Sequence, residues 1–191
     1  SSPRRRKLLL RLQIPFDIIL PNVDESIIPV EGSPETYCTS LAELKSSDIS
    51  QHYPDRIVIG SDTIVALDNH IMGKPSNKAQ AQKMLNTLSG KTHLVYTGVC
   101  VKWAHQNIHH LFAEITMVTF RKLESSDINH YIETCPPYDK AGSYGIQDWS
   151  AIFVHEIKGC YDNVVGFPIS RFYKELKKLD INLLDSVSKK S

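Results

Sequence analysis

The distribution of apolar and polar positions along the chain predicts a β-sheet with helices packed on it. The most pronounced strand pattern is RIVIGSDTIVAL, residues 56–67, in which β-branched residues dominate and an Asp-Asn-His turn follows. Two further apolar segments, THLVYTGVCVKWA and HHLFAEITMVTFRKL, are separated by the polar HQNIH and predict an antiparallel hairpin. Shorter strands are expected at residues 16–20 and in AIFVHEI.

Helices are predicted where apolar residues recur every three or four positions behind a capping residue. In the helix predicted to start at Ser76, Ala81, Met84, Leu85 and Leu88 fall on one face. Long antiparallel strands interspersed with helices indicate the α/β (mixed α+β) class, with helices on the faces of the sheet. The predicted helices start at Ser2-Pro3, at Ser33-Pro34 (running to about Ile49), at Ser76 (ending at Gly90), and in the segments ESSDINHYIET and GFPISRFYKELKKL.

Composition narrows the class of protein further. The chain has 191 residues, 41% of them hydrophobic, which is enough for one core and predicts a single domain over 1–191 with a tail at 181–191. A net charge of +1 gives no overall field for nucleic acid or a membrane surface. Four widely spaced cysteines predict reduced thiols, and with no apparent signal peptide or membrane span the expected location is the cytoplasm. No GxGxxG or GxxxxGK[ST] pattern occurs.

Asp62 is the residue that the strand pattern does not explain. It lies among apolar strand residues, where a lone carboxylate costs several kcal/mol unless a partner compensates it. Glu25, in the acidic loop VDES, could converge with Asp62 on Mg²⁺ or Mn²⁺, which prefer oxygen ligands. The plainer alternative is a solvated loop acid together with an aspartate that bonds its own backbone.

Three other segments offer groups that could bind an anion or a base. Arg4 and Arg5 lie in SSPRRR at a helix start, where positive charge opposes the helix dipole unless an anion intervenes. Lys74 lies between a glycine and a proline in GKP, and Gln147 closes the glycine-rich DKAGSYGIQ. Each also has an ordinary explanation, as a solvated basic patch, a surface lysine or a plain loop. Together with the carboxylates they suit a phosphorylated ligand that carries a base.

The chain resembles the Maf-like nucleotide pyrophosphatases. The segments SSPRRRKLL, VDES, IVIGSDTIVALDNHIMGKP, AQKMLNTLSGKTHLVYTGV, YDKAGSYGIQ and NVVGFP occur in that family's order, from Ser1 to about Leu179. The resemblance implies an inosine triphosphatase-like fold, with a central mixed sheet, flanking helices and a cleft between two lobes. It also implies a cytoplasmic, homodimeric enzyme that uses Mg²⁺ or Mn²⁺ to split nucleoside triphosphates into monophosphate and pyrophosphate.

The resemblance also assigns roles to individual residues. Asp62 matches the family's catalytic acid, and its role as general base or as metal ligand stays open. Glu25 matches a metal-associated glutamate, and Lys45 and Lys74 match lysines on the phosphate side. Arg4, Thr63 and Gln147 match positions that differ between subfamilies, and the residues here resemble the branch acting on dTTP and UTP. Arg5 would join in binding the departing phosphates.

Two alternatives remain at this point. The family begins with a short apolar strand ending in a site serine, and this sequence starts just after that place, so a non-catalytic nucleotide-binding or regulatory protein is the main rival. Release of pyrophosphate would separate the two. A nucleic-acid binder using SPRRRK and ELKKL is the third class, and the near-neutral charge argues against it.

Overall fold

A five-stranded sheet forms the centre of the molecule. The computed structural model describes residues 2–183. Its strands are β1 (Val58–Leu67), β2 (His70–Met72), β3 (Thr92–Trp103), β4 (Ile108–Phe120) and β5 (Val154–Lys158). The spatial order is β2-β1-β3-β4-β5, and all four pairings are antiparallel. The α/β class is confirmed, but the prediction of a mixed sheet was wrong. Two of the pairings, β1–β2 and β3–β4, are short hairpins, which permit only antiparallel pairing, and the longer connections from β2 to β3 and from β4 to β5 also return antiparallel strands.

Two of these connections have turn chemistry that the sequence indicates. Asp68 and Asn69 join β1 to β2 with φ values of 49° and 65°, the left-handed pair that a two-residue hairpin requires. Asp and Asn tolerate this conformation better than most residues. The β3–β4 hairpin turns through η2 (Ala104–Gln106) and Asn107, whose φ is 53°. Both predicted turns are therefore confirmed.

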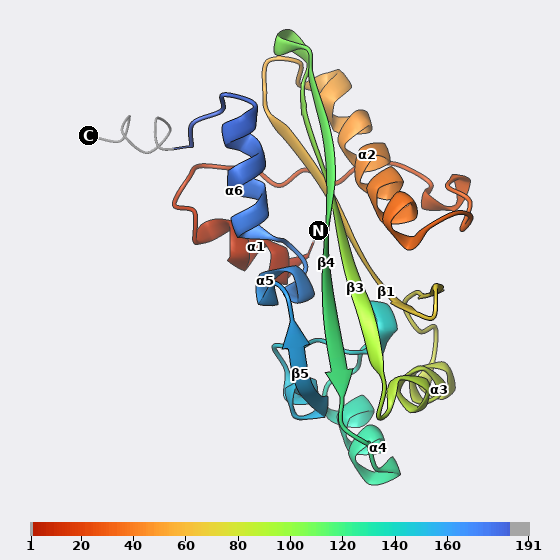
Figure 1. Ribbon diagram of the computed structural model, residues 1–191. Helices are drawn as coiled ribbons and strands as arrows, with labels where there is room; N and C mark the ends of the chain where they lie inside the picture. The colour runs from red at the N-terminus through yellow and green to blue at the C-terminus, as the bar shows by residue number, and fades with distance from the viewer. Residues whose placement is uncertain (1, 184–191) are drawn as a thin grey trace.

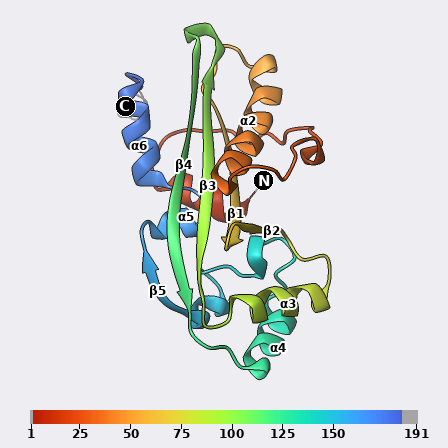
Figure 2. The same ribbon diagram turned by 45° about the vertical axis from the view of Figure 1, so that its right-hand side comes forward.

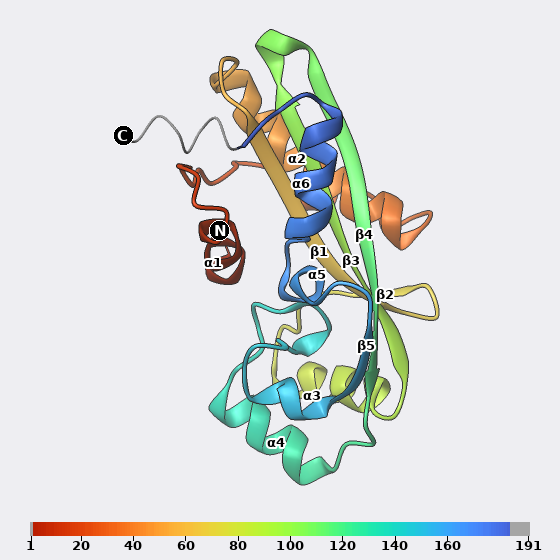
Figure 3. The same ribbon diagram turned by 60° about the vertical axis from the view of Figure 1, so that its left-hand side comes forward.

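Helices cover both faces of the sheet and one end of it (Figures 1 and 3). The helix α2 lies on one face against β1 and β3, and α1, α5 and α6 lie on the opposite side (Figure 3). At the other end of the long hairpin, α3 and α4 lie side by side (Figures 1 and 2). Their bounds are α1 (Pro3–Leu10), α2 (Pro34–His52), α3 (Lys78–Leu88), α4 (Ser125–Thr134), α5 (Tyr161–Val165) and α6 (Ile169–Lys178).

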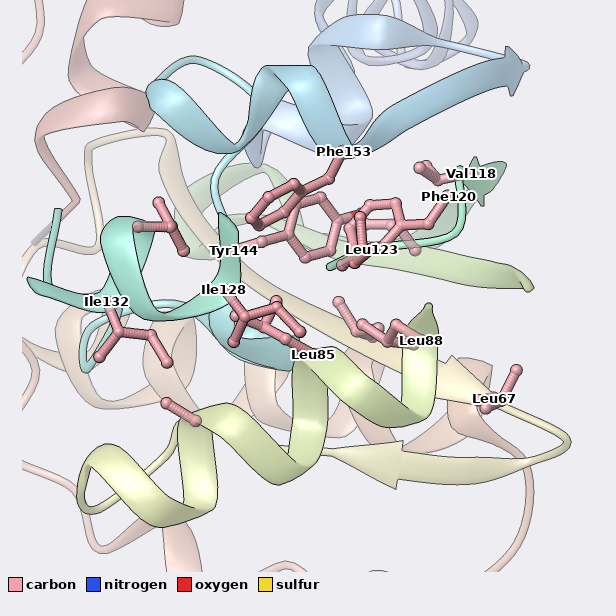
Figure 4. Packing of buried hydrophobic residues seen from close by; sticks show 14 residues of the cluster. Leu67, Leu85, Leu88, Val118, Phe120, Leu123, Ile128, Ile132, Tyr144 and Phe153 are labelled. Atoms are coloured by element: carbon pink, nitrogen blue, oxygen red, sulfur yellow. The ribbon is translucent and has the colours of Figure 1, made fainter. Parts of the chain in front are cut away.

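The β3–β4 hairpin takes part in two cores, one at each end. Near α3 and α4, Leu85, Leu88 and Phe120 are buried in the cluster of Figure 4. Near α1 and α6, Val99, Phe167 and Phe172 belong to a second cluster. Because single strands run through both clusters, the two halves are rigidly tied to one sheet.

Several local predictions differ from the structure. Residues 16–20 form no strand: Ile18 and Leu20 are exposed, and no strand among residues 2–183 pairs with them. In AIFVHEI only the second half is a strand, because Asp148 caps the 3₁₀ helix η4 (Trp149–Phe153). The cap of α3 is Asn77, whose side chain accepts from the Gln80 amide, one residue after the expected serine. The predicted tail at 181–191 lies largely outside the described residues, which end at 183.

Candidate active site

Asp62 is compensated by a lysine from the helix that covers its strand. Lys45 Nζ lies 2.6 Å from Asp62 Oδ1, and the two side chains are only 17% and 19% exposed. The close approach of α2 depends on glycine, because Asp62 is paired with Gly98, where an added Cβ would collide with the Cys38 carbonyl. At Gly60 the same collision would occur with Ala42 and Ser46. The charge inside the strand is therefore half of a shielded ion pair.

Glu25 meets the same lysine from the acidic loop. The loop forms η1 (Glu25–Ile27), which Asp24 caps by accepting from the Ser26 amide at 2.9 Å. Glu25 Oε1 lies 3.0 Å from Lys45 Nζ, so one ammonium contacts two carboxylates that are 37 positions apart in sequence. Asp62 and Glu25 thus converge on the Lys45 ammonium, and their convergence on a divalent ion stays a prediction.

The two carboxylates fit a divalent ion of the Mg²⁺ type. No group of three or more His, Cys, Asp or Glu residues that could hold a metal occurs in residues 2–183. A cation on Asp62 and Glu25 would therefore complete its shell with water and ligand oxygens. This is the usual arrangement for Mg²⁺, which binds one or two carboxylates and substrate phosphates. Both donors are hard oxygens that already surround one positive charge.

Thr63 points to the opposite face of β1, where Arg5 holds it. Consecutive strand residues alternate faces. Arg5 donates from Nε to the Gly166 carbonyl at 2.9 Å and from Nη2 to Thr63 Oγ1 at 3.2 Å. Thr63 Oγ1 lies 2.9 Å from Thr97 Oγ1, and either hydroxyl can be the donor of that bond. Thr97 also lies within hydrogen-bond distance of the Asn163 carbonyl at 3.1 Å, and Thr63 of the Gly166 carbonyl at 3.4 Å. Arg5, Thr63 and Thr97 therefore form one network that reaches residues 163–166.

Asp62 and Arg5 influence each other across the strand. Burial lowers the pKa of the Arg5 guanidinium, while the charge of Asp62 acts to raise it. The β1 edge beside these residues is open in the sense that no strand of residues 2–183 pairs with it, because β2 pairs only with Val65–Leu67. A ligand at this edge could contact both faces of β1 at once.

Arg4 contacts a different segment from its neighbour Arg5. Its Nη1 lies 2.8 Å from Asp139 Oδ2, in the glycine-rich segment that the sequence analysis singled out. Lys140 Nζ contacts the other Asp139 oxygen at 3.0 Å. Thus α1 supplies one arginine to Thr63 and one to the 138–148 segment.

Lys74 and Gln147 are exposed and are not joined to the other predicted residues. Neither side chain makes a hydrogen bond or ion pair within residues 2–183. The Gly73 carbonyl accepts from the Gly142 amide at 3.0 Å, which fixes the backbone before Lys74. Two surface hollows lie elsewhere, one beside Asn69 and Met117 and one beside Leu10 and Phe16. The cleft between two lobes therefore stays a prediction.

The structure adds residues that the sequence analysis missed. Burial raises the pKa of the Tyr37 hydroxyl, and the charges of Asp62 and Glu25 raise it further. The spacing of Tyr37, Leu41 and Lys45 on one helix face could have indicated it. No sequence pattern could have indicated Lys140 in the same way, because its contact with Asp139 lies within an irregular loop.

Comparisons with known proteins identify the family of this chain. The model of the Maf-like protein family matches residues 1–179. A protein of Bacillus cereus (strain AH187) named dTTP/UTP pyrophosphatase is 47% identical over 183 residues, covering 96% of this chain and 94% of the relative. Proteins of the same name from Bacillus anthracis and Bacillus cereus (strain ATCC 14579) are 47% and 46% identical with the same coverage. The chain belongs to the Maf-like protein family.

Proposed function

We propose that this protein is a nucleoside triphosphate pyrophosphatase that acts on dTTP, UTP or a modified pyrimidine triphosphate. The observation that carries the proposal is the convergence of Asp62, Lys45 and Glu25 beside the open edge of β1. The names of the relatives, which are 46–47% identical over nearly their whole length, supply the substrate class. The products would be the nucleoside monophosphate and pyrophosphate.

In the proposed reaction Asp62 orients a water molecule for in-line attack on the α-phosphorus. The water oxygen forms a bond to that phosphorus, the bond to the oxygen bridging the α- and β-phosphorus atoms breaks, and pyrophosphate leaves with the electron pair. Asp62 takes the water proton if it acts as general base. If it serves only as a metal ligand, the proton passes to solvent. Either role needs the carboxylate held in one place, and Lys45 contacts its Oδ1 at 2.6 Å.

Positive charge near the phosphates would come from several directions. Asp62 and Glu25 would hold Mg²⁺ or Mn²⁺, and such an ion supplies charge to phosphate oxygens when bound. Lys45 lies beside both carboxylates, Arg5 lies across the strand, and exposed Lys74 would complete the phosphate contacts. Gln147 would contact the uracil or thymine edge, with Thr63 and Arg4 on the same side.

The setting of the enzyme is part of the same proposal. We propose one domain, because the β3–β4 hairpin belongs to both cores. Free thiols at all four cysteines support a cytoplasmic location. No helix among the described residues is long and apolar enough to cross a membrane. A homodimer is proposed from the family resemblance.

The test is release of pyrophosphate from a panel of ordinary and methylated nucleoside triphosphates with Mg²⁺ or Mn²⁺. The protein should prefer dTTP and UTP, and Asp62→Asn should lower turnover roughly 10²- to 10⁴-fold, the contribution of a positioned acid or base. Asp68→Asn is the matched control, because this exposed residue ends the same strand and Asn also adopts its left-handed conformation. Absence of pyrophosphate from the unmodified protein, or parental turnover in Asp62→Asn, would refute the proposal.

A further inference from the structure

A chain of ion pairs runs from α1 into the segment that carries Gln147. Arg4 contacts Asp139 at 2.8 Å, Asp139 contacts Lys140 at 3.0 Å, and Lys140 Nζ lies 3.5 Å from Asp148 Oδ2. Arg4 starts the chain, and Asp148 is the neighbour of Gln147. Two residues expected to meet the substrate are thus linked through three that are not.

Lys140 is the centre of this chain. Its side chain is 13% exposed, which is uncommon for a lysine, and the Pro136 carbonyl also lies 3.4 Å from its Nζ. The stem packs so closely on Gly145 that an added Cβ there would lie 2.9 Å from Lys140 Cδ and Cε. The lysine therefore fills the inside of the loop, and its charge is satisfied by groups of the same loop.

Asp148 and Ile146 fix the backbone on either side of Gln147. Asp148 Oδ1 accepts from the Ser150 amide at 3.1 Å and from the Ser150 hydroxyl at 2.7 Å. Tyr131 of α4 contacts the other oxygen at 3.4 Å. Ile146 is buried in the cluster beneath α1 and α6. The Gln147 side chain itself is exposed. It therefore projects toward solvent from a backbone that is held at both neighbours.

This arrangement matters for telling uracil from cytosine. Uracil presents an acceptor at O4 and a donor at N3, whereas cytosine presents a donor at N4 and an acceptor at N3. A glutamine amide carries both a donor and an acceptor, so rotating it by half a turn lets it match the other base. Discrimination therefore needs one orientation of the amide against the ring, and a backbone held on both sides of Gln147 sets the position from which the amide reaches the base. We propose that Lys140, with Asp139 and Asp148, is a positioning element that sets pyrimidine selectivity through Gln147. The inference rests on the proposed function.

A purely structural role for these ion pairs is the rival explanation. Exposed ion pairs contribute about 0–1 kcal/mol to stability, and Asp139 is 59% exposed. A structural role would lower the melting temperature and reduce kcat/KM for every nucleotide alike. A positioning role changes the ratio of kcat/KM values between UTP and CTP, which uniform destabilisation does not move.

The experiment measures kcat/KM for UTP and CTP in the full chain and in Lys140→Met, which keeps the apolar stem and removes the charge. We expect the UTP-to-CTP ratio to fall roughly tenfold, the discrimination that one base contact supplies. Lys78→Met is the matched control: it removes an exposed ion pair to Glu133, 2.7 Å long, between α3 and α4. Its ratio should equal that of the parent. An unchanged ratio in Lys140→Met overturns the inference.

A second variant keeps the test decisive if Lys140→Met folds poorly. Asp139→Asn alters an exposed side chain and removes the charge that pairs with Arg4 and Lys140. Its UTP-to-CTP ratio should therefore fall as well, and an unchanged ratio in this variant overturns the inference. Failure of the proposed function is a different result. It would appear as no pyrophosphate release from the unmodified protein, whereas failure of this inference leaves turnover intact and the ratio constant.

Discussion

The two faces of β1 are held in different ways. On the α2 face, Asp62 is fixed by one lysine that protrudes from a 19-residue helix, and glycines let that helix approach the sheet. On the opposite side, Arg4 of the short helix α1 is joined by an ion pair to Asp139 of an irregular loop, where Asp139 also pairs with Lys140. In the proposed reaction Asp62 and Lys45, which would act on the water and the phosphates, thus lie on a strand and a long helix, whereas Gln147, which would contact the base, lies on a loop. Substitutions on the α2 face are therefore expected to lower activity and stability strongly, whereas substitutions on the loop side should have smaller effects, mainly on base selectivity.

Removal of Lys45 should have the largest effect. Lys45→Met removes the ammonium that contacts both Asp62 and Glu25, so we expect kcat/KM to fall at least about 100-fold. The free energy of unfolding should drop by about 1–3 kcal/mol, since a partly buried charge loses its partner. Lys102→Met is the control, because this lysine also bridges α2 and the sheet through Ser47 at 2.7 Å. Equal effects in both variants, measured by kinetics and urea unfolding, would contradict the special role of Lys45.

A methyl group at Gly98 should come second. Gly98→Ala forces α2 away from the strand beside Asp62, and overpacking of this kind costs about 1–3 kcal/mol. Activity should fall with stability, because Lys45 moves with the helix. At Gly73 an added Cβ meets no atom within 4 Å, so Gly73→Ala should be nearly neutral. Denaturant midpoints of the two variants test this, and similar midpoints would refute the close approach.

A substitution on the loop side, Asp139→Asn, should change the free energy of unfolding least, and the change should depend on pH. Burial acts to raise the pKa of Asp139, but hydrogen bonds from Arg4 and Lys140 outweigh it and hold the value below 3.8. A lowered folded-state pKa means that the stabilisation is present above pH 3.8 and is lost as pH falls through the folded value. The unfolding free energies of the parent and Asp139→Asn should differ by at most about 1 kcal/mol and converge below pH 3.8. A difference that grows in acid would contradict the assignment.

The sequence predicted the regular elements of this fold well, for local reasons. Ser2 and Ser33 cap their helices as expected, each accepting from the backbone amide three residues later. The Asp68-Asn69 turn and the β3–β4 hairpin follow from residue types that favour those conformations. The prediction of a strand at residues 16–20 was wrong, because a residue's preference for strands depends on packing against a neighbouring strand, and no strand among residues 2–183 pairs with this segment.

The residues of the candidate site could be proposed from the sequence, but the contacts among them could not. Asp62 raised the right question, but its answer, Lys45, comes from a tertiary contact that no local pattern contains. The family resemblance placed Lys45 and Glu25 in the site without indicating that one ammonium joins both carboxylates. Lys140 was missed because an irregular loop has no periodicity from which burial could be inferred.

The most direct test of the central claim is hydrolysis of dTTP in water enriched in ¹⁸O, followed by mass spectrometry of both products. Attack of a water held by Asp62 on the α-phosphorus places one ¹⁸O atom in dTMP and none in pyrophosphate, and Asp62→Asn should form almost no labelled product. Label in pyrophosphate, or labelled dTMP formed by Asp62→Asn at the parental rate, would contradict the account.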